Sequence, residues 1–367
     1  MILDDPKVKS AAFRNIPAVL EQAGTPHLGV VLRRDFLIGL AALGVTSLIP
    51  EAAMAAQTQE TAPAGPRRID VHHHFSPPGF IAEIKARKTG QTALMEWTPQ
   101  KSIEDMDRGG VAAAVMSVSE PSVWFGDDAA ARKLARECND FGAKCVRDYP
   151  GRFGVFATLP LPDVDGALRE IEYCFDTLKV EGACVMTSYA GKYLGDPAFA
   201  AVMDELNRRK AVVYCHPFRA ACCQNLLPGG NGLGGELVND TTRTITSVLY
   251  SGTVTRCPEI RFIWSHGGGT VPYITGRLSG AARQLPKGLI YELQKFYYDT
   301  AQAVNPYTLP SFKKLVPVAH ILFGTDFPFV TAETTAQGLR DNGEFSASEL
   351  RAIERDNARA LFPRLKT

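Results

Sequence analysis

The chain has 367 residues, of which 45% are hydrophobic and 22% are charged, and its net charge is +1. This composition is typical of a globular protein with enough apolar material for a sizeable core. The balanced charge argues against a nucleic-acid-binding protein, because binding to phosphates requires lysine and arginine gathered in a basic stripe. No internal repeat or heptad pattern indicates a solenoid or a coiled coil.

Residues 1–55 have the layout of an N-terminal extension followed by a twin-arginine export signal. Arg33 and Arg34 precede an apolar run at 38–49, and small residues at 53–55 follow it. The run has about a dozen residues, whereas a spanning helix needs roughly 20, so we expect no stable membrane span after signal removal. Residues 56–67 are predicted to form a flexible linker. The pattern predicts twin-arginine export to the periplasm; the alternative is a chance arginine pair before an apolar helix.

From residue 68 to residue 367, short apolar runs alternate with amphipathic stretches of helical period. The runs are rich in β-branched and aromatic residues, which is typical of strands buried on both faces of a parallel sheet. The expected strands are 69–72, 112–118, 153–159, 183–187, 211–216, 261–266, 296–300 and 320–325. The helical candidates include 129–148, 165–178, 197–209 and 346–361. The alternation predicts an α/β fold, a (β/α)8 TIM barrel. An open doubly wound sheet is the alternative, but it would normally place a glycine-rich turn after its first strand.

Local capping signals support two of these helices. Asp196 and Pro197 offer an N-cap residue followed by proline at the first helical position. Ser346 and Glu349 have the spacing of a capping box. We therefore expect helices to begin at these two points.

Five of the seven histidines and one aspartate stand at the ends of expected strands. His72 and His74 end the first strand two residues apart, so their side chains point the same way, whereas His73 points the opposite way as a packing or supporting residue. The other members end the fifth, sixth and eighth strands: His216, His266 and Asp326. In a barrel, functional groups gather at the C-terminal ends of several strands, and imidazole with carboxylate suits Zn²⁺, with Mn²⁺ or Fe²⁺ as alternatives. The sequence therefore predicts a metal site at this end of the barrel.

Several motifs are similar to those of the amidohydrolase superfamily and, more narrowly, of its aminocarboxymuconate-semialdehyde decarboxylase branch. They are Ile69-Asp70-Val71-His72-His73-His74, Cys215-His216-Pro217, Ser265-His266-Gly267-Gly268-Gly269 and Phe323-Gly324-Thr325-Asp326-Phe327-Pro328. Segments 106–111, 125–128 and 159–163 resemble the 6-methylsalicylate decarboxylases within that branch. The resemblance covers roughly residues 68–362 and implies a metal-dependent barrel.

The resemblance also implies a role for each matching residue. The implied metal ligands are His72, His74, His216 and Asp326. His266 and Asp326 are the implied catalytic residues. The fourth strand lacks the lysine that bridges two metals in many hydrolases of the superfamily. One divalent cation is therefore expected, Zn²⁺ first and Mn²⁺ as the alternative.

Four further residues are candidates for binding the substrate. Arg277 matches a branch arginine that reaches the substrate carboxylate of a neighbouring subunit, which implies a homodimer; a solvated helix arginine is the alternative. Trp124, Tyr189 and Phe329 lie in loops near strand ends and are predicted to wall an aromatic pocket, with core packing as the alternative reading. Segment 100–104 lacks the arginine of the founding enzyme, which argues against aminocarboxymuconate as the substrate.

The resemblance implies non-oxidative decarboxylation of a small aromatic acid, a 2-hydroxybenzoate such as 6-methylsalicylate. Protonation of the ring by Asp326 or His266 would precede loss of CO2. The alternative is a hydrolase of a lactone, amide or ester, with Asp326 as base and His266 stabilising the developing oxyanion. A non-catalytic binding protein is the third reading, and it predicts an incomplete ligand set, whereas this set is complete. Release of CO2 without consumption of water separates the first two.

Overall fold

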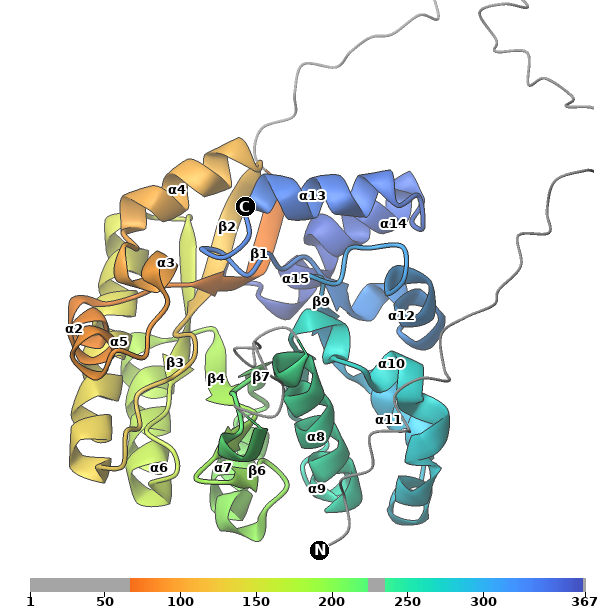
Figure 1. Cartoon of the computed structure of the whole chain (residues 1–367), viewed down its shortest axis with the longest axis horizontal. Helices are drawn as coiled ribbons and strands as arrows, with labels where there is room; N and C mark the ends of the chain where they lie inside the picture. The colour runs from red at the N-terminus through yellow and green to blue at the C-terminus, as the bar shows by residue number, and fades with distance from the viewer. Residues whose placement is uncertain (1–66, 224–234, 366–367) are drawn as a thin grey trace, which may run out of the picture. The chain divides into compact units, whose positions relative to one another are not determined.

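The computed structural model describes residues 67–223 and 235–365. The predicted export signal and all but the last residue of the predicted linker lie outside the described residues. Within the described part, one parallel sheet joins eight strands in the order β1-β2-β3-β4-β7-β8-β9-β10 (Figure 1). These strands are β1 (Arg68–His74), β2 (Val111–Ser117), β3 (Phe153–Thr158), β4 (Gly182–Met186), β7 (Val212–His216), β8 (Arg261–Trp264), β9 (Tyr297–Asp299) and β10 (Ile321–Leu322). A separate antiparallel pair, β5 (Ser188–Tyr189) and β6 (Lys192–Tyr193), forms a short hairpin after β4.

The sheet closes on itself through the segment that follows β10. The Val71 amide donates to the Phe323 carbonyl at 3.0 Å, and the Asp326 amide donates to the His72 carbonyl at 2.8 Å. A parallel bridge joins His73 to Phe327. The first and last strands are therefore neighbours, and the predicted (β/α)8 barrel is confirmed.

Helices surround the strands in Figure 1. The longer ones are α2 (Pro78–Arg87), α4 (Pro99–Arg108), α5 (Asp128–Asp148), α6 (Val164–Glu172), α7 (Ala200–Arg208), α8 (Glu236–Tyr250), α11 (Leu289–Lys295), α12 (Leu309–Leu315) and α13 (Ala332–Asp341). The shorter ones are α3 (Thr92–Met95), α9 (Thr253–Arg256), α10 (Val271–Ile274), α14 (Ala347–Arg351) and α15 (Asn357–Leu361). No helix in the described ranges is both long and apolar enough to cross a membrane.

The predicted helices are present, but three of them are irregular. The stretch predicted at 165–178 is α6 followed by a π-helical turn, Tyr173–Leu178, and the stretch at 346–361 is α14 and α15 joined by the π-helical turn Ala352–Asp356. The stretch at 197–209 begins with a 3₁₀ turn before α7. Both predicted caps are confirmed, since Asp196 accepts from the Ala198 amide and Ser346 with Glu349 forms a complete capping box.

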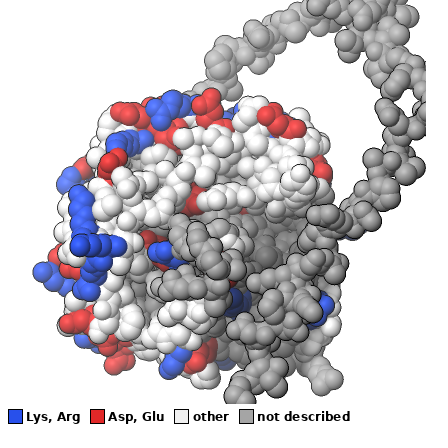
Figure 2. Space-filling view, in the orientation of Figure 1, with Lys and Arg blue, Asp and Glu red and all other residues white. Residues whose placement is uncertain are grey.

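The strands are buried on both faces, as their composition predicts. Every residue of β3, β4 and β7 is buried. Within the core, Tyr214 stacks on Phe156 with ring centroids 5.4 Å apart, and its ring lies 5.3 Å from that of His72. The outer surface is different: acidic and basic side chains lie interspersed around the margin of the face in Figure 2. The ends of the buried strands thus offer a rigid, desolvated platform for polar groups.

Candidate metal centre

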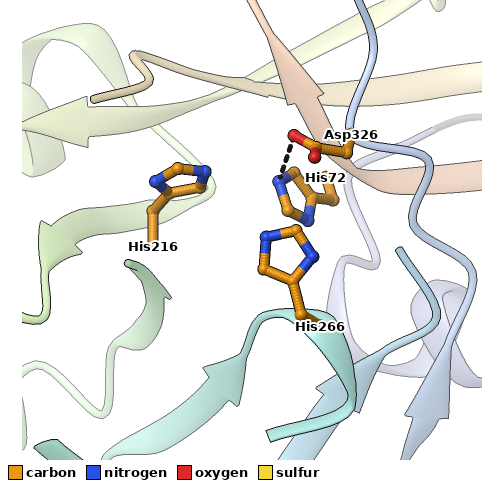
Figure 3. A group of neighbouring side chains, drawn as sticks. All are labelled: His72, His216, His266 and Asp326. Carbon is orange, nitrogen blue, oxygen red and sulfur yellow. Dashed lines mark ion pairs between the residues drawn. The ribbon is translucent and has the colours of Figure 1, made fainter. Parts of the chain in front are cut away.

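Four buried side chains from different strands converge at the C-terminal end of the barrel. His72, His216, His266 and Asp326 can each offer one ligand atom, and these atoms all lie within 4.8 Å of one another. Figure 3 shows the His72 and His266 rings and the Asp326 carboxylate turned toward a common point, with His216 approaching from the end of a neighbouring strand. His72 Nε2 lies 3.1 Å from Asp326 Oδ1.

His74 belongs to the same centre, and His73 does not. His74 Nε2 lies 3.1 Å from His72 Nε2 and 3.1 Å from Asp326 Oδ1. His73 points the other way, where its Nδ1 bonds Asp70 at 3.0 Å and its Nε2 bonds the Ser102 hydroxyl at 2.8 Å. The alternation of side chains along β1 is therefore as predicted.

Hydrogen bonds set the orientation of all four histidines in the centre. In each ring Nδ1 faces an oxygen: Asp299 Oδ2 for His72 (2.8 Å), the Ser117 carbonyl for His74 (3.3 Å), the Pro217 carbonyl for His216 (2.9 Å) and the Ala301 carbonyl for His266 (3.1 Å). A carbonyl oxygen only accepts, so Nδ1 carries the hydrogen and Nε2 keeps a lone pair. The Nε2 atoms and the Asp326 carboxylate are then acceptors facing one another. Such a donor set fits a divalent cation, which satisfies all of them at once.

The electrostatics of the centre separate His72 from the other three histidines. Burial opposes a charge on His72, but the carboxylates of Asp299 and Asp326 outweigh it and raise the pKa of His72 to about 10. Burial lowers the pKa of His74, His216 and His266. Burial also disfavours the Asp326 anion, yet the neighbouring His72 holds the pKa of that carboxyl well below its usual range. His74, His216 and His266 therefore favour the neutral form beside an ionised Asp326, as metal ligation needs. His72 is held as a cation by its two carboxylates, and it would release that proton on binding a metal.

Asp299 supports this centre and was absent from the predicted site. It is fully buried at the end of β9, and its Oδ1 accepts from the amides of His266 at 2.9 Å and Ala301 at 3.0 Å. Its Oδ2 bonds His72, so one carboxylate fixes the positions of two histidines. Asp299 lies near the end of a predicted strand, 296–300, so the rule that selected the histidines could have found it.

Gln302 also contacts the centre, and no sequence signal predicts it. Its side-chain amide donates to Asp326 Oδ2, while Oδ1 faces His72 and His74. Gln302, His266 and Asp326 all have positive φ angles, of 52°, 53° and 70°. Non-glycine residues in this region cost about 1–3 kcal/mol each, and such strain gathers at functional sites. Hydrogen bonds from the His266 amide to Asp299 and from the Asp326 amide to the His72 carbonyl hold two of these backbones in place.

A glycine allows the Asp326 segment to approach the first strand. A Cβ at Gly324 would lie 2.9 Å from the Cβ of His72 and 2.8 Å from that of Asp299, closer than real side chains come. The next residue is tied down as well, because the Thr325 hydroxyl donates to Asp70 Oδ2 at 2.7 Å. Close packing and a buried hydrogen bond therefore place Asp326 against His72.

A cavity of about 480 Å³ opens onto the centre. His216, His266, Asp326, Gln302 and Phe329 are among the residues that line it. The Phe329 ring lies 5.9 Å from that of His74, as expected for an aromatic wall beside the ligands. No lysine or arginine of the described chain lines this cavity, which we call the metal pocket. The negative charge of an anionic ligand in this pocket would have to be balanced by a bound cation or by a basic residue of another subunit.

The other predicted substrate contacts lie elsewhere. Trp124 and Tyr189 line a neighbouring cavity and not the metal pocket. Arg277 is exposed in the 3₁₀ segment Thr275–Gln284 and lines neither cavity. The structure thus brings Phe329 to the metal pocket, and the substrate-binding roles of the other three stay predictions.

Comparison with known proteins identifies the family. Residues 69–364 match the amidohydrolase family, and the chain belongs to it. A decarboxylase of Aspergillus niger, yanB, is 35% identical over 324 residues, covering 82% of this chain and 88% of that protein. The 6-methylsalicylic acid decarboxylase acuB of Aspergillus aculeatus is 34% identical over 323 residues, covering 82% and 97%. The structure of a dihydroxybenzoic acid decarboxylase of Polaromonas sp. JS666, with bound manganese and the inhibitor 2-nitroresorcinol, superimposes with a TM-score of 0.72 at 23% identity and covers 82% and 98%. The predicted family is therefore confirmed.

Proposed function

We propose that this protein is a metal-dependent carboxy-lyase that removes CO2 from a 2-hydroxybenzoate-type acid such as 6-methylsalicylate. The observation that carries the proposal is the set of histidine Nε2 atoms and the Asp326 carboxylate, which face one another beside a cavity that no described lysine or arginine lines. The two fungal relatives are both named as decarboxylases, one of them of 6-methylsalicylic acid. Family, donor set and cavity thus support the same chemistry.

The proposed ligands of one cation are His72, His74, His216 and Asp326. Neutral imidazole with carboxylate suits Zn²⁺, and the manganese in the Polaromonas decarboxylase makes Mn²⁺ the alternative. When bound, such a cation supplies the positive charge and the template that orient an anionic substrate. Metal analysis of the protein purified from its native host, together with reactivation of chelator-treated protein by each ion, tests the assignment.

Other side chains that line the metal pocket would contact the substrate ring or donate the proton. Phe329 offers an aromatic face to the ring of the substrate. His266 holds its Nδ1 hydrogen against the Ala301 carbonyl, so its Nε2 is the atom that can carry a second, transferable proton. Burial lowers the pKa of His266, so its protonated form is a stronger acid and gives up its proton more readily. Asp326 is the second candidate donor, and Gln302 holds one of its oxygens in place.

The proposed reaction balances without a further reactant. A proton adds to the ring carbon that carries the carboxylate, which interrupts the aromatic system. The bond between that carbon and the carboxylate then breaks, CO2 leaves, and the electron pair returns to the ring. The product is a neutral phenol, and the catalytic residue is reprotonated from solvent.

The test is an incubation of Zn²⁺-loaded and Mn²⁺-loaded protein with 6-methylsalicylate and related 2-hydroxybenzoates while CO2 is followed. We expect release that disappears in the Asp326→Asn variant. A parallel panel of lactones, amides and esters addresses the hydrolase alternative. Hydrolysis in that panel with no CO2 from any aromatic acid would contradict the proposal while leaving the metal centre intact.

A homodimer in which Arg277 serves the neighbouring subunit is the second part of this proposal. Arg277 is exposed and does not line the metal pocket of its own chain, so we assign its role with the substrate carboxylate to another subunit. Sedimentation gives the oligomeric state. Mixing inactive Asp326→Asn and Arg277→Ala subunits tests the role, because a mixed dimer regains one complete site. Absence of recovered activity from a confirmed mixed dimer would contradict it.

The third part is export to the periplasm by the twin-arginine route, which carries folded proteins and would allow the metal to be loaded first. Arg33 and Arg34 ahead of a short apolar run support it. Fractionation of the native host tests it, with an Arg33→Lys/Arg34→Lys variant as the control. We expect processed periplasmic protein from the natural chain and cytoplasmic precursor from the variant; full-length natural protein in the cytoplasm would contradict the proposal.

A further inference from the structure

We propose that the cavity beside the metal pocket is a binding site for uncharged phenols, the product class of the reaction; the choice of ligand rests on the proposed function. We call this cavity the aromatic pocket, and it has a volume of about 440 Å³. Its lining includes Ser122, Trp124, Ser188, Tyr189, Tyr193 and Phe218.

The aromatic pocket is built by the same loops that border the metal pocket. Ser119 and Glu120 line the metal pocket, and the next residues, Pro121 and Ser122, line the aromatic pocket. The segment at the end of β7 also borders both cavities, since His216 lines the metal pocket and Phe218 lines the aromatic pocket. Glu120 Oε1 accepts from the Arg219 side chain at 2.8 Å and so ties these two loops together. A ligand leaving the metal centre therefore has the second cavity next to it.

The rings that wall the aromatic pocket are held by the protein's own hydrogen bonds. The Trp124 indole donates to Asp128 at 2.9 Å, the Tyr189 hydroxyl accepts from the Met186 amide at 2.7 Å, and the Tyr193 hydroxyl donates to Asp240 at 2.7 Å. Each polar end thus already has one hydrogen-bond partner within the protein. What they can offer a ligand is aromatic surface, which binds another ring by stacking or edge contact.

Two serine hydroxyls in the aromatic pocket could form hydrogen bonds with a ligand. The hydroxyls of Ser122 and Ser188 line it, and neither has a side-chain hydrogen-bond partner among the described residues. A serine hydroxyl both donates and accepts, so either residue can pair with a phenol hydroxyl. Apolar walls with a few placed polar groups are typical of sites for small neutral molecules.

The uncharged lining of the aromatic pocket favours binding of the product over binding of the substrate. None of the described residues that line the aromatic pocket is charged, whereas Glu120, Asp326 and the histidines line the metal pocket. A 2-hydroxybenzoate is an anion at neutral pH, and burying a carboxylate without a partner is strongly unfavourable. Decarboxylation removes that charge and leaves a neutral ring. The aromatic pocket therefore accepts the product and rejects the substrate, which clears the metal centre for the next turnover.

The experiment is calorimetric binding of 3-methylphenol to the full-length protein carrying Asp326→Asn, which separates binding from turnover. Ala221→Trp, added to this background, fills the pocket from its rim, and Trp124→Ala removes one wall. We expect one molecule of 3-methylphenol per chain, an affinity about fivefold weaker with Trp124→Ala, and no binding with Ala221→Trp. 6-Methylsalicylate at the same concentration should not displace the phenol. Melting curves check that each variant is folded.

Two results would overturn the inference: binding that neither substitution changes, or displacement by 6-methylsalicylate as effective as by a second phenol. Failure of this inference and failure of the proposed function give different results. Phenol binding that follows this pattern in a protein that releases no CO2 would overturn the proposed function alone. CO2 release by a protein in which 3-methylphenol does not bind at the aromatic pocket would overturn this inference alone.

Discussion

The metal pocket and the aromatic pocket open at the same end of one barrel, yet their chemistry and their construction differ. The ligands of the first stand at strand ends, are fully buried and are oriented by hydrogen bonds to oxygens. The walls of the second come mainly from loops, including the β5–β6 hairpin, and the described residues among them carry no charge. Rigid strand ends therefore supply the precise donor set, whereas loops supply the shape and polarity that select ligands.

Removing the carboxylate of the metal pocket is the change with the largest expected effect. Asp326→Asn replaces the anion by a neutral amide, so both a proposed metal ligand and a candidate proton donor are lost. We expect decarboxylation to fall by about 10³-fold or more. Initial rates of CO2 release measure this, and circular dichroism checks the fold. Activity within tenfold of the natural protein would contradict the assigned centre.

The next change tests whether Asp299 positions the histidines. Asp299→Asn removes the charge that faces His72 while keeping the shape, and we expect metal affinity to weaken by about 10–100-fold. Competition with a chelator gives the dissociation constant. Asp128→Asn is the matched control, because Asp128 contacts Trp124 at the aromatic pocket. Equal loss of metal affinity in both variants would show that the two pockets are not independent.

Gln302→Leu should have a smaller effect on the same centre. The substitution leaves Asp326 Oδ2 without its donor, and a lost hydrogen bond to a buried charged group costs about 1–3 kcal/mol. We expect kcat/KM to fall about tenfold, mainly through kcat, with little change in the melting temperature. A change in KM alone would mean that Gln302 contacts the substrate and does not hold Asp326.

The smallest effect is expected outside both pockets, at Glu205 on α7. Hydrogen bonds from Arg208 and Arg209 lower the pKa of Glu205 to about 2. This carboxylate therefore stabilises the fold above its unfolded pKa of roughly 4.3, and the contribution is lost as the pH falls toward 2. Because Glu205 is only partly buried and its partner Arg208 is exposed, we expect Glu205→Gln to cost only about 0.5 kcal/mol at pH 7.

Chemical denaturation of the Glu205→Gln variant and the natural protein measures this difference. We expect the difference in unfolding free energy to shrink between pH 5 and pH 2, with metal and phenol binding unchanged at pH 7. A difference that grows on acidification would contradict the assigned ion pairs.

Much of the barrel and most of its metal centre could be predicted because their signals are local. Apolar runs of β-branched residues mark buried strands, and the alternation along β1 separates His72 and His74 from His73. Capping at Asp196 and Ser346 depends on residues within one turn. Asp299 could also have been predicted, because it too lies near the end of an expected strand, but it was not among the predicted site residues.

Other features were decided only by the tertiary structure. Gln302 meets Asp326 because two loops pack together, and no spacing along the chain records that contact. Trp124 and Tyr189 were predicted to wall an aromatic pocket, and only the structure places them in a cavity separate from the one that His216, His266 and Asp326 line. The sequence by itself determined the barrel and the residues at its strand ends, because hydrophobic period and strand direction act over a few residues. Tertiary packing decided which loop side chains share a cavity, because the direction of a loop side chain depends on neighbours distant in sequence.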